Sequence, residues 1–184
     1  GGSTPFHGEK GTTWEGGFRV PMMVRWPGTV QPGTRSDAII SQEDWLPTLL
    51  AAAGEDDIVG KLKKGHRANG KKWKVHLDGY NFQPFLAGKT DKSPREEIMY
   101  FDADGNLNAV RWNDWKINFA VQTGNITNAV RETPGWPVIT HLKADPFEVM
   151  HHESSMYMRW YADNMWLFVP VQQRVAAFLG SLKG

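Results

Sequence analysis

The stretch "EEIMYFDADGNLNAVRWNDWKINFAV", residues 96–121, decides the fold. It contains three short runs rich in aromatic and branched residues, "EEIMYFD", "LNAVRW" and "WKINFAV". The turn sequences "ADGN" and "WND" separate them. Runs of this kind joined by such turns are typical of β-hairpins, so the stretch predicts an antiparallel meander. "VITHL", residues 138–142, is expected to add a fourth strand.

A helix is expected after these strands, near the end of the sequence. In "VPVQQRVAAFLGSL", residues 169–182, apolar side chains recur every three or four positions. This spacing places them on one stripe of an α-helix. The stripe consists of Val171, Val175, Phe178, Leu179 and Leu182.

Ahead of the meander, the pattern predicts a strand at about 17–26, ended by "WPG", and a short strand around 38–40. "SQEDWLPTLLAAAG", residues 41–54, is typical of a helix. Ser41 and Asp44 resemble a capping box, although Asp44 is itself a possible N-cap, and Gly54 is a natural residue just after the helix end. Residues 55–78 are expected to form a long basic loop.

The order of these elements indicates an α/β fold. We expect the end of a mixed α/β sheet, followed by a small α+β subdomain with an antiparallel sheet and a C-terminal helix. The predicted segments are 1–54, 55–78 and 79–184.

Composition narrows the class of protein. The 184 residues are 40% hydrophobic and include nine tryptophans, as expected of a folded chain. No apolar run approaches the ~18 residues of a membrane span, so no membrane association is expected. The sequence contains no cysteine, which excludes disulfides, cysteine ligands and a cysteine nucleophile within these residues.

Lys10 is the sharpest candidate for a binding residue. It stands in "HGEKGTTWEGG", residues 7–17, where glycines let the backbone approach a ligand closely and threonines add hydroxyl donors. A cation on such a loop suits an anion. From the pattern alone, Lys10 is either an anion-binding residue or a solvated loop lysine, with Glu15 available as its ion-pair partner.

Other features leave alternatives open. The run "KLKKGHRANGKKWK", residues 61–74, carries seven basic residues and no acid, whereas the net charge of the whole chain is only +1. It is either a polyanion-binding segment or a solvated loop. Nucleic acid is not the expected partner, because only Trp73 interleaves with the charges and could stack on bases. His151 and His152 lack a metal-binding spacing, and Asp102 with Asp104 fits a hairpin turn better than a calcium loop.

Several stretches resemble the sulfatase family. The first is "PFHGEKGTTWEGGFRVP", residues 5–21, followed by "RWPG". "DWLPTLLAAAG" resembles the helix that follows in those enzymes, while "HLDGYNFQPFLAG", the stretch 93–119 and "HLKADPFE" resemble the C-terminal parts of bacterial arylsulfatases. The resemblance implies an alkaline phosphatase-like fold, of which this sequence is the C-terminal portion.

The resemblance also implies a site. The lysine matching Lys10 touches the sulfate group in that family, so Lys10 is expected to act catalytically and to bind a sulfate ester. His7 occupies a position where many relatives have arginine, and it is a second substrate-binding candidate. The family uses a formylglycine nucleophile and Ca²⁺, but its Cys/Ser-x-Pro-x-Arg motif is absent here. No metal ligand is therefore expected in this sequence.

The resemblance implies a sulfuric ester hydrolase represented by a C-terminal fragment that is inactive alone. Its partner would be the remainder of the catalytic domain, and a periplasmic or secreted location is implied. The apolar strand at 17–26 would favour self-association. The alternatives are a phosphate or phosphonate ester hydrolase of the same superfamily and a non-catalytic polyanion-binding module that uses residues 61–74.

Overall fold

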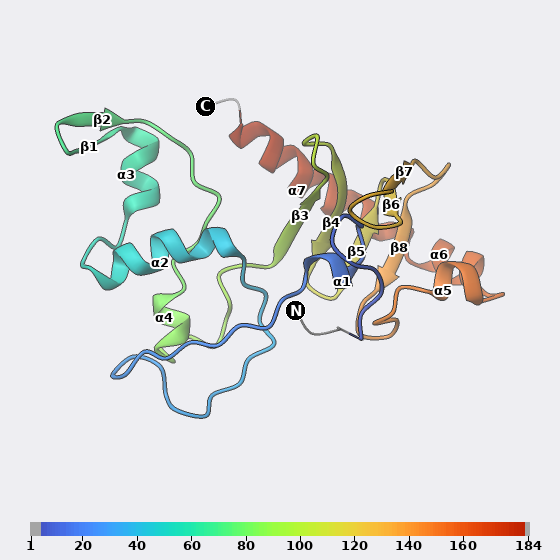
Figure 1. The fold of residues 1–184 in the computed structure, drawn as a ribbon, viewed down its shortest axis with the longest axis horizontal. Helices are drawn as coiled ribbons and strands as arrows, with labels where there is room; N and C mark the ends of the chain where they lie inside the picture. The colour runs from blue at the N-terminus through green and yellow to red at the C-terminus, as the bar shows by residue number, and fades with distance from the viewer. Residues whose placement is uncertain (1–4, 183–184) are drawn as a thin grey trace. The chain divides into compact units, whose positions relative to one another are not determined.

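Four antiparallel strands form the main sheet, in the order β3–β4–β5–β8 (Figure 1). β3 spans Glu97–Phe101, β4 Leu107–Trp112, β5 Trp115–Asn118 and β8 Val138–His141. The computed structural model describes residues 5–182. It confirms the predicted meander and its fourth strand.

One face of this sheet is apolar and is covered by helices. Side chains alternate between the faces of a strand, so Val110, Ile117 and Ile139 point to the same side. They pack with residues of α6 (Tyr157–Asp163), η2 (Met165–Leu167) and α7 (Phe168–Ser181). The fully buried members of this core are Val110, Ile117, Ile139, Leu167 and Val171.

The amphipathic helix predicted near the end of the chain is confirmed as α7. Its stripe is buried only in part. Val171 is buried, whereas Leu179 and Leu182 are 46% and 61% exposed. Periodicity therefore located the helix correctly but overstated the length of its buried face.

The opposite face of the sheet is polar. It carries Tyr100 from β3, Arg111 from β4 and Lys116 from β5, because register places these residues across from one another or on diagonals. Tyr100 and Lys116 are nevertheless almost completely buried. The segment around α1 (Glu15–Phe18) contacts this face through the bonds described below.

A second compact unit comprises residues 22–96 together with 177–182, while the first comprises 5–21 and 97–176. The second unit contains η1 (Gln42–Asp44), α2 (Trp45–Ala52), α3 (Ile58–Lys64) and α4 (Gln83–Leu86). The predicted helix is confirmed as α2; the Ser41 N–H donates to Asp44 Oδ2 at 2.7 Å, and Gly54 follows with φ +93°. The assignment of 1–54, 55–78 and 79–184 to separate segments stays a prediction.

The expected strands at 17–26 and 38–40 were wrong. Residues 15–18 form α1, and residues 19–26 and 38–40 belong to no strand. A strand requires a hydrogen-bonded neighbour, and none of the described strands pairs with either stretch. Met23 is fully exposed. Self-association through this apolar stretch stays a prediction.

The expected long loop at 55–78 was also wrong in part. Residues 58–64 form α3, and β1 (His66–Ala68) pairs with β2 (Lys71–Trp73) as a hairpin. Asn69 and Gly70 make the turn with φ values of +51° and +75°. Asn-Gly is the residue pair that a two-residue hairpin turn favours. The prediction of a loop rested on the charge of the run and overlooked this turn signal.

A second hairpin was not predicted. The run "WKINFAV" is divided, because the backbone N–H groups of Phe119 and Ala120 both donate to Asn108 O. The chain then forms β6 (Val121–Thr123), which pairs with β7 (Val130–Glu132). One short helix, α5 (Met150–Glu153), follows β8. No described helix has the length and apolar character needed to cross a bilayer.

Candidate functional site

The loop that carries Lys10 is compact and hydrogen-bonded. The Thr12 N–H and hydroxyl both donate to Glu9 O, at 3.0 and 2.7 Å. The Gly16 N–H donates to His7 O at 2.7 Å. These bonds fold residues 7–16 back on themselves, so Lys10 stands at a tight turn.

Gly16 is required by this packing. A Cβ atom at residue 16 would lie 2.3 Å from Gly8 O and 2.5 Å from His7 O. Backbone atoms at that distance cannot move aside without reshaping the turn. Gly8 and Gly11 have φ values of +78° and +94°, in the left-handed region that favours glycine. The glycines therefore have a structural purpose, in addition to any approach to a ligand.

Lys10 itself is exposed. Among residues 5–182, its side chain makes no hydrogen bond or ion pair. The alternative that Glu15 pairs with Lys10 was wrong, because Glu15 is fully buried and is bound by other cations. The Lys10 ammonium is thus available to an anion from solvent.

His7 is held in one orientation. Its ring stacks on Trp14, with centroids 4.6 Å apart and planes 8° from parallel. Its Nδ1 lies 3.1 Å from Phe147 O. Because a carbonyl oxygen can only accept, this contact requires hydrogen on Nδ1 and leaves Nε2 as the ring atom available to a substrate. The sequence suggested His7 but gave no sign of this tautomer.

A buried ion network lies under the loop. Lys116 Nζ donates to Thr13 O at 2.6 Å and to Glu148 Oε1 at 2.8 Å, and lies 3.2 Å from Glu15 Oε1. The Glu15 N–H donates to Glu148 Oε2 at 2.6 Å. Arg19 Nε and Arg111 Nη1 contact the second oxygen of Glu15, at 2.5 and 3.2 Å. All three central side chains are shielded from solvent.

The network sets the ionisation of both carboxyl groups. Burial alone would raise the pKa of Glu15, but Lys116, the Tyr100 hydroxyl at 2.6 Å and the two arginines lower that pKa to about 2. Burial raises the pKa of Glu148, and Lys116 only partly opposes this. Glu15 is therefore firmly ionised, while the charge of Glu148 depends on Lys116.

Sequence reasoning missed this network. One signal was present: Lys116 is a charged residue between the apolar residues Trp115 and Ile117 of a strand, and a buried cation needs a buried partner. Nothing in the sequence indicated that the partners would be Glu15 and Glu148, which are 101 and 32 positions away.

A histidine cluster borders the same loop. The ring of Trp14 lies between His7 and His151, whose centroid is 5.7 Å from that of Trp14. The rings of His151 and His152 are 3.8 Å apart. Burial lowers the pKa of His151 to about 4, and His152 adds to the effect. A neutral His151 therefore packs under Trp14 at neutral pH.

Nothing in the described part of the chain forms a group of three His, Cys, Asp or Glu residues able to hold a metal ion. Asp102 makes a turn: its Oδ1 accepts the N–H groups of Asp104 and Asn106, at 3.0 and 2.8 Å. This confirms the hairpin-turn interpretation of "DADGN".

Comparison with known proteins finds similarity to sulfatases. Residues 1–55 match the sulfatase family model. Human steryl-sulfatase is 35% identical over 117 residues, and human arylsulfatase A 37% over 117, in each case 61% of this chain. The crystal structure of PsFucS1 sulfatase from Pseudoalteromonas sp. superposes with a TM-score of 0.76 at 25% identity, covering 97% of this chain.

These matches support the interpretation of the chain as the C-terminal part of a sulfatase-like protein. The chain spans only part of its relatives, namely 17% of the human steryl-sulfatase, 20% of the human arylsulfatase A and 33% of the PsFucS1 chain. The likeness to PsFucS1 also supports the expected α/β sulfatase fold.

The segment 1–55, which matches the sulfatase model, contains Lys10, His7 and Glu15. Lys116 and Glu148 lie outside it. The loop with the candidate residues and the sheet that holds it thus come from separate parts of the sequence.

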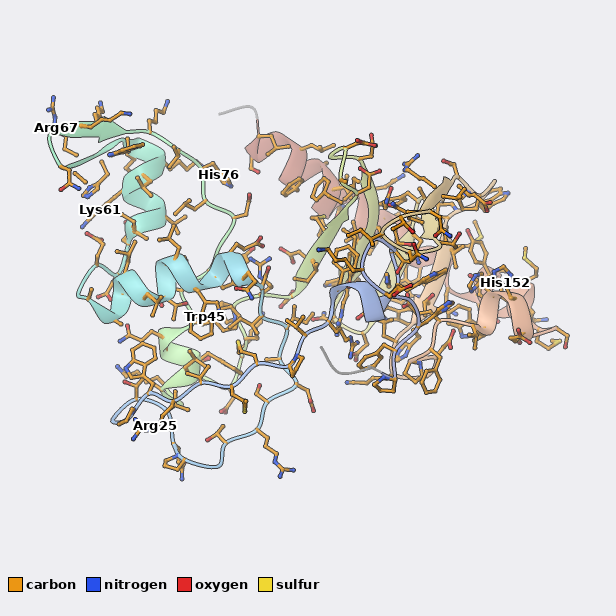
Figure 2. All side chains as sticks on the ribbon, in the orientation of Figure 1. Arg25, Trp45, Lys61, Arg67, His76 and His152 are labelled. Carbon is orange, nitrogen blue, oxygen red and sulfur yellow. The ribbon has the colours of Figure 1, made fainter. Side chains whose placement is uncertain are left out.

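Two further features of the chain lie away from this loop in sequence. The basic run forms α3 and the β1–β2 hairpin, and Figure 2 shows Lys61 on α3 and Arg67 on β1. Lys61 pairs with Glu55 at 2.5 Å, and Lys71 Nζ lies 4.3 Å from the centre of the Trp73 ring. The run is therefore folded, with most of its charges exposed.

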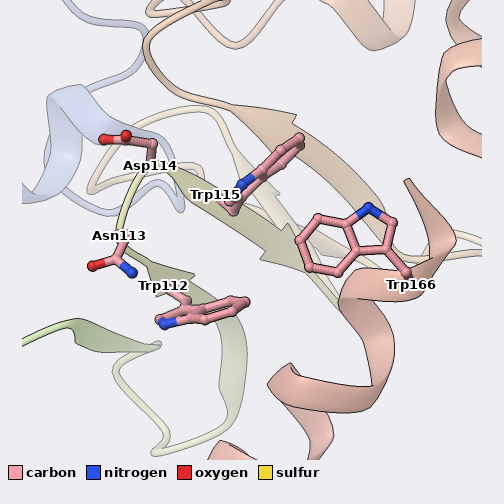
Figure 3. Close-up of a pocket in the computed structure, with 5 residues that line it drawn as sticks. All are labelled: Trp112, Asn113, Asp114, Trp115 and Trp166. Carbon is pink, nitrogen blue, oxygen red and sulfur yellow. The ribbon is translucent and has the colours of Figure 1, made fainter. Parts of the chain in front are cut away.

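The second feature is a pocket at the β4–β5 turn (Figure 3). Three indole rings border it, from Trp112, Trp115 and Trp166. Asn113 and Asp114 complete the lining. Asp114 is paired with Lys143 at 2.9 Å, so the pocket holds no unpaired charge of its own.

Proposed function

We propose that this chain is part of a sulfuric ester hydrolase of the arylsulfatase type, in which Lys10 binds the sulfate group. The observation that carries the proposal is the state of Lys10. It is an exposed cation without an ion-pair partner among residues 5–182, on a loop fixed from below by buried ion pairs. Relatives that share this segment are named steryl-sulfatase and arylsulfatase A.

The chemistry of Lys10 fits this role. An ammonium group donates charge-assisted hydrogen bonds to sulfate oxygens, and these strengthen as the S–O bond breaks and negative charge grows on the oxygens. Because the loop is already ordered, Lys10 needs little rearrangement to meet the substrate. His7 Nε2 is the second group that we assign to substrate binding.

The cofactors implied by the family do not fit the described residues. No cluster there would hold Ca²⁺, and the sequence lacks the motif that yields formylglycine. The proposal therefore assigns both groups to parts of the full-length protein outside these 184 residues. The same proposal makes the chain alone inactive and the full-length enzyme periplasmic or secreted.

The test uses the full-length protein that carries this chain. Lys10→Ala should lower turnover of an aryl sulfate by ~10²-fold or more, the loss typical of a removed transition-state donor. Lys89→Ala is the control, because Lys89 is also an exposed loop lysine. Unchanged turnover in Lys10→Ala would end the assignment. Preference of the wild type for an aryl phosphate would favour the phosphate-ester alternative.

The polyanion-binding module is kept as a second candidate because the β1–β2 hairpin and α3 expose a dense set of cations. Retention on heparin tests this second candidate separately from the first, because Lys10 is not part of the basic run.

A further inference from the structure

We infer that Glu15, Lys116 and Glu148 are positioning residues for Lys10, so that the C-terminal sheet controls the geometry of the sulfate-binding loop. This inference rests on the proposed function of Lys10. It concerns residues that act through the loop and do not touch the substrate themselves.

The first support is the number of bonds that join the loop to the sheet. Thr13 alone is fixed at three atoms: its N–H donates to Gln122 O, its hydroxyl oxygen accepts the Gln122 N–H, and its carbonyl accepts Lys116 Nζ. The distances are 3.1, 3.0 and 2.6 Å. Thr13 is three residues from Lys10, so we expect a shift at Thr13 to displace the backbone that carries the ammonium.

The second support is the backbone of Glu148. It is fully buried and has a φ of +54°, a conformation that a non-glycine residue adopts at a cost. This conformation brings its carboxylate to both Lys116 Nζ and the Glu15 N–H, at 2.8 and 2.6 Å. The strain is therefore located where the sheet side of the network meets the first residue of α1.

The third support is the pairing of buried charges. The network contains two carboxylates, Glu15 and Glu148, and three cations, Lys116, Arg111 and Arg19. Buried charges are expensive unless they are paired in a definite geometry. A displacement of the loop would leave a buried carboxylate or ammonium unpaired, so the cluster opposes such a displacement.

Tyr100→Phe is the mildest variant that tests the inference. The ring of Tyr100 lies 4.5 Å from Lys116 Nζ and is kept, whereas the hydroxyl that donates to Glu15 Oε1 at 2.6 Å is removed. A hydrogen bond to a charged group is worth about tenfold in an equilibrium. We therefore expect kcat/KM for an aryl sulfate in the full-length enzyme to fall by about tenfold.

The matched control is Tyr157→Phe. That hydroxyl also lies in the first unit, where it donates to Ile139 O at 2.9 Å and accepts the Ile139 N–H, so its hydrogen bonds go to Ile139 and not to Glu15. Its loss should change kcat/KM by less than about twofold at a temperature where circular dichroism shows both variants folded. A stronger variant, Lys116→Met, should lower kcat/KM by ~10²-fold, since a misplacement of about 1 Å can cost that much.

A double-mutant cycle separates positioning from general weakening. In a Lys10→Ala background, Tyr100→Phe should change kcat/KM by less than about twofold, because the group that it positions is gone. An equal loss in both backgrounds, or no loss in either, would overturn the inference. If Lys10→Ala itself has no effect, the proposed function fails instead. If Lys116→Met does not fold, the Tyr100→Phe cycle still decides.

Discussion

Replacing Lys116 with methionine tests the energetics of the buried network directly. The change keeps an unbranched side chain of similar length but removes the cation. It leaves Glu148 and Glu15 buried, and it deprives Thr13 O of its 2.6 Å donor. Removing one partner of a buried pair costs about 3–5 kcal/mol. Arg111 and Arg19 still face Glu15, so most of the penalty should fall on Glu148.

The pH dependence gives the sharper test. Without Lys116, the pKa of Glu148, already raised by burial, should rise further. The folded variant then binds a proton more readily than its unfolded chain, so its free energy of unfolding increases as pH falls. One extra proton contributes up to about 1.4 kcal/mol per pH unit. The penalty relative to wild type should therefore shrink by about 1–3 kcal/mol between pH 7 and pH 5.

Urea unfolding followed by tryptophan fluorescence at both pH values measures this penalty. Lys143→Met is the matched control, because it breaks the exposed pair with Asp114 and should cost less than about 1 kcal/mol at either pH. A penalty for Lys116→Met that is equally large at pH 5 and pH 7 would refute the reasoning, because it would mean that no carboxylate is left unpaired.

Three further outcomes are expected. Asp44→Ala should lower the free energy of unfolding by about 3–5 kcal/mol, because Asp44 is buried against Arg95 at 2.7 Å, while Glu43→Ala should cost about 1 kcal/mol or less in the same urea experiment. Leu167→Ala should lower the free energy of unfolding by about 2–5 kcal/mol, because it leaves a cavity in the core, whereas Val169→Ala at an exposed position should lower it by about 0.5 kcal/mol. Thermal unfolding measures both. If the polyanion alternative holds, the protein should be retained on heparin at low salt, and this retention should disappear after neutralisation of Lys63, Lys64, Lys71 and Lys72. Salt-insensitive flow-through of the unaltered protein would exclude that alternative.

Local patterns predicted the meander, α2 and α7 because the residues that decide those elements are neighbours in the sequence. The strand expected at 17–26 failed for the opposite reason. Alternation of apolar residues such as Val20 and Met22 indicates an extended segment, but a strand also needs a partner, and partners are not encoded locally. The basic hairpin was missed because charge drew attention away from the Asn69–Gly70 turn signal.

The candidate site divides in the same way. Lys10 and His7 could be named from a short motif. Their supports could not, because Glu15 meets Lys116 and Glu148 only after the sheet and the segment following β8 have folded. Likewise, the tautomer of His7 depends on a carbonyl 140 positions away. Long-range pairing of this kind has no spacing that a reader of the sequence could recognise.

The anchoring of Thr13 by Lys116 has a consequence for biosynthesis. A ribosome delivers the lysine-bearing loop about a hundred residues before the ammonium that fastens it. Domains form as units while the chain emerges, and contacts of high sequence separation come last. The loop to which we assign substrate binding should therefore stay unsettled in the nascent polypeptide until translation has passed the hairpin carrying Lys116, so premature termination upstream of that hairpin would yield a product in which the Lys10 loop has never taken its final shape.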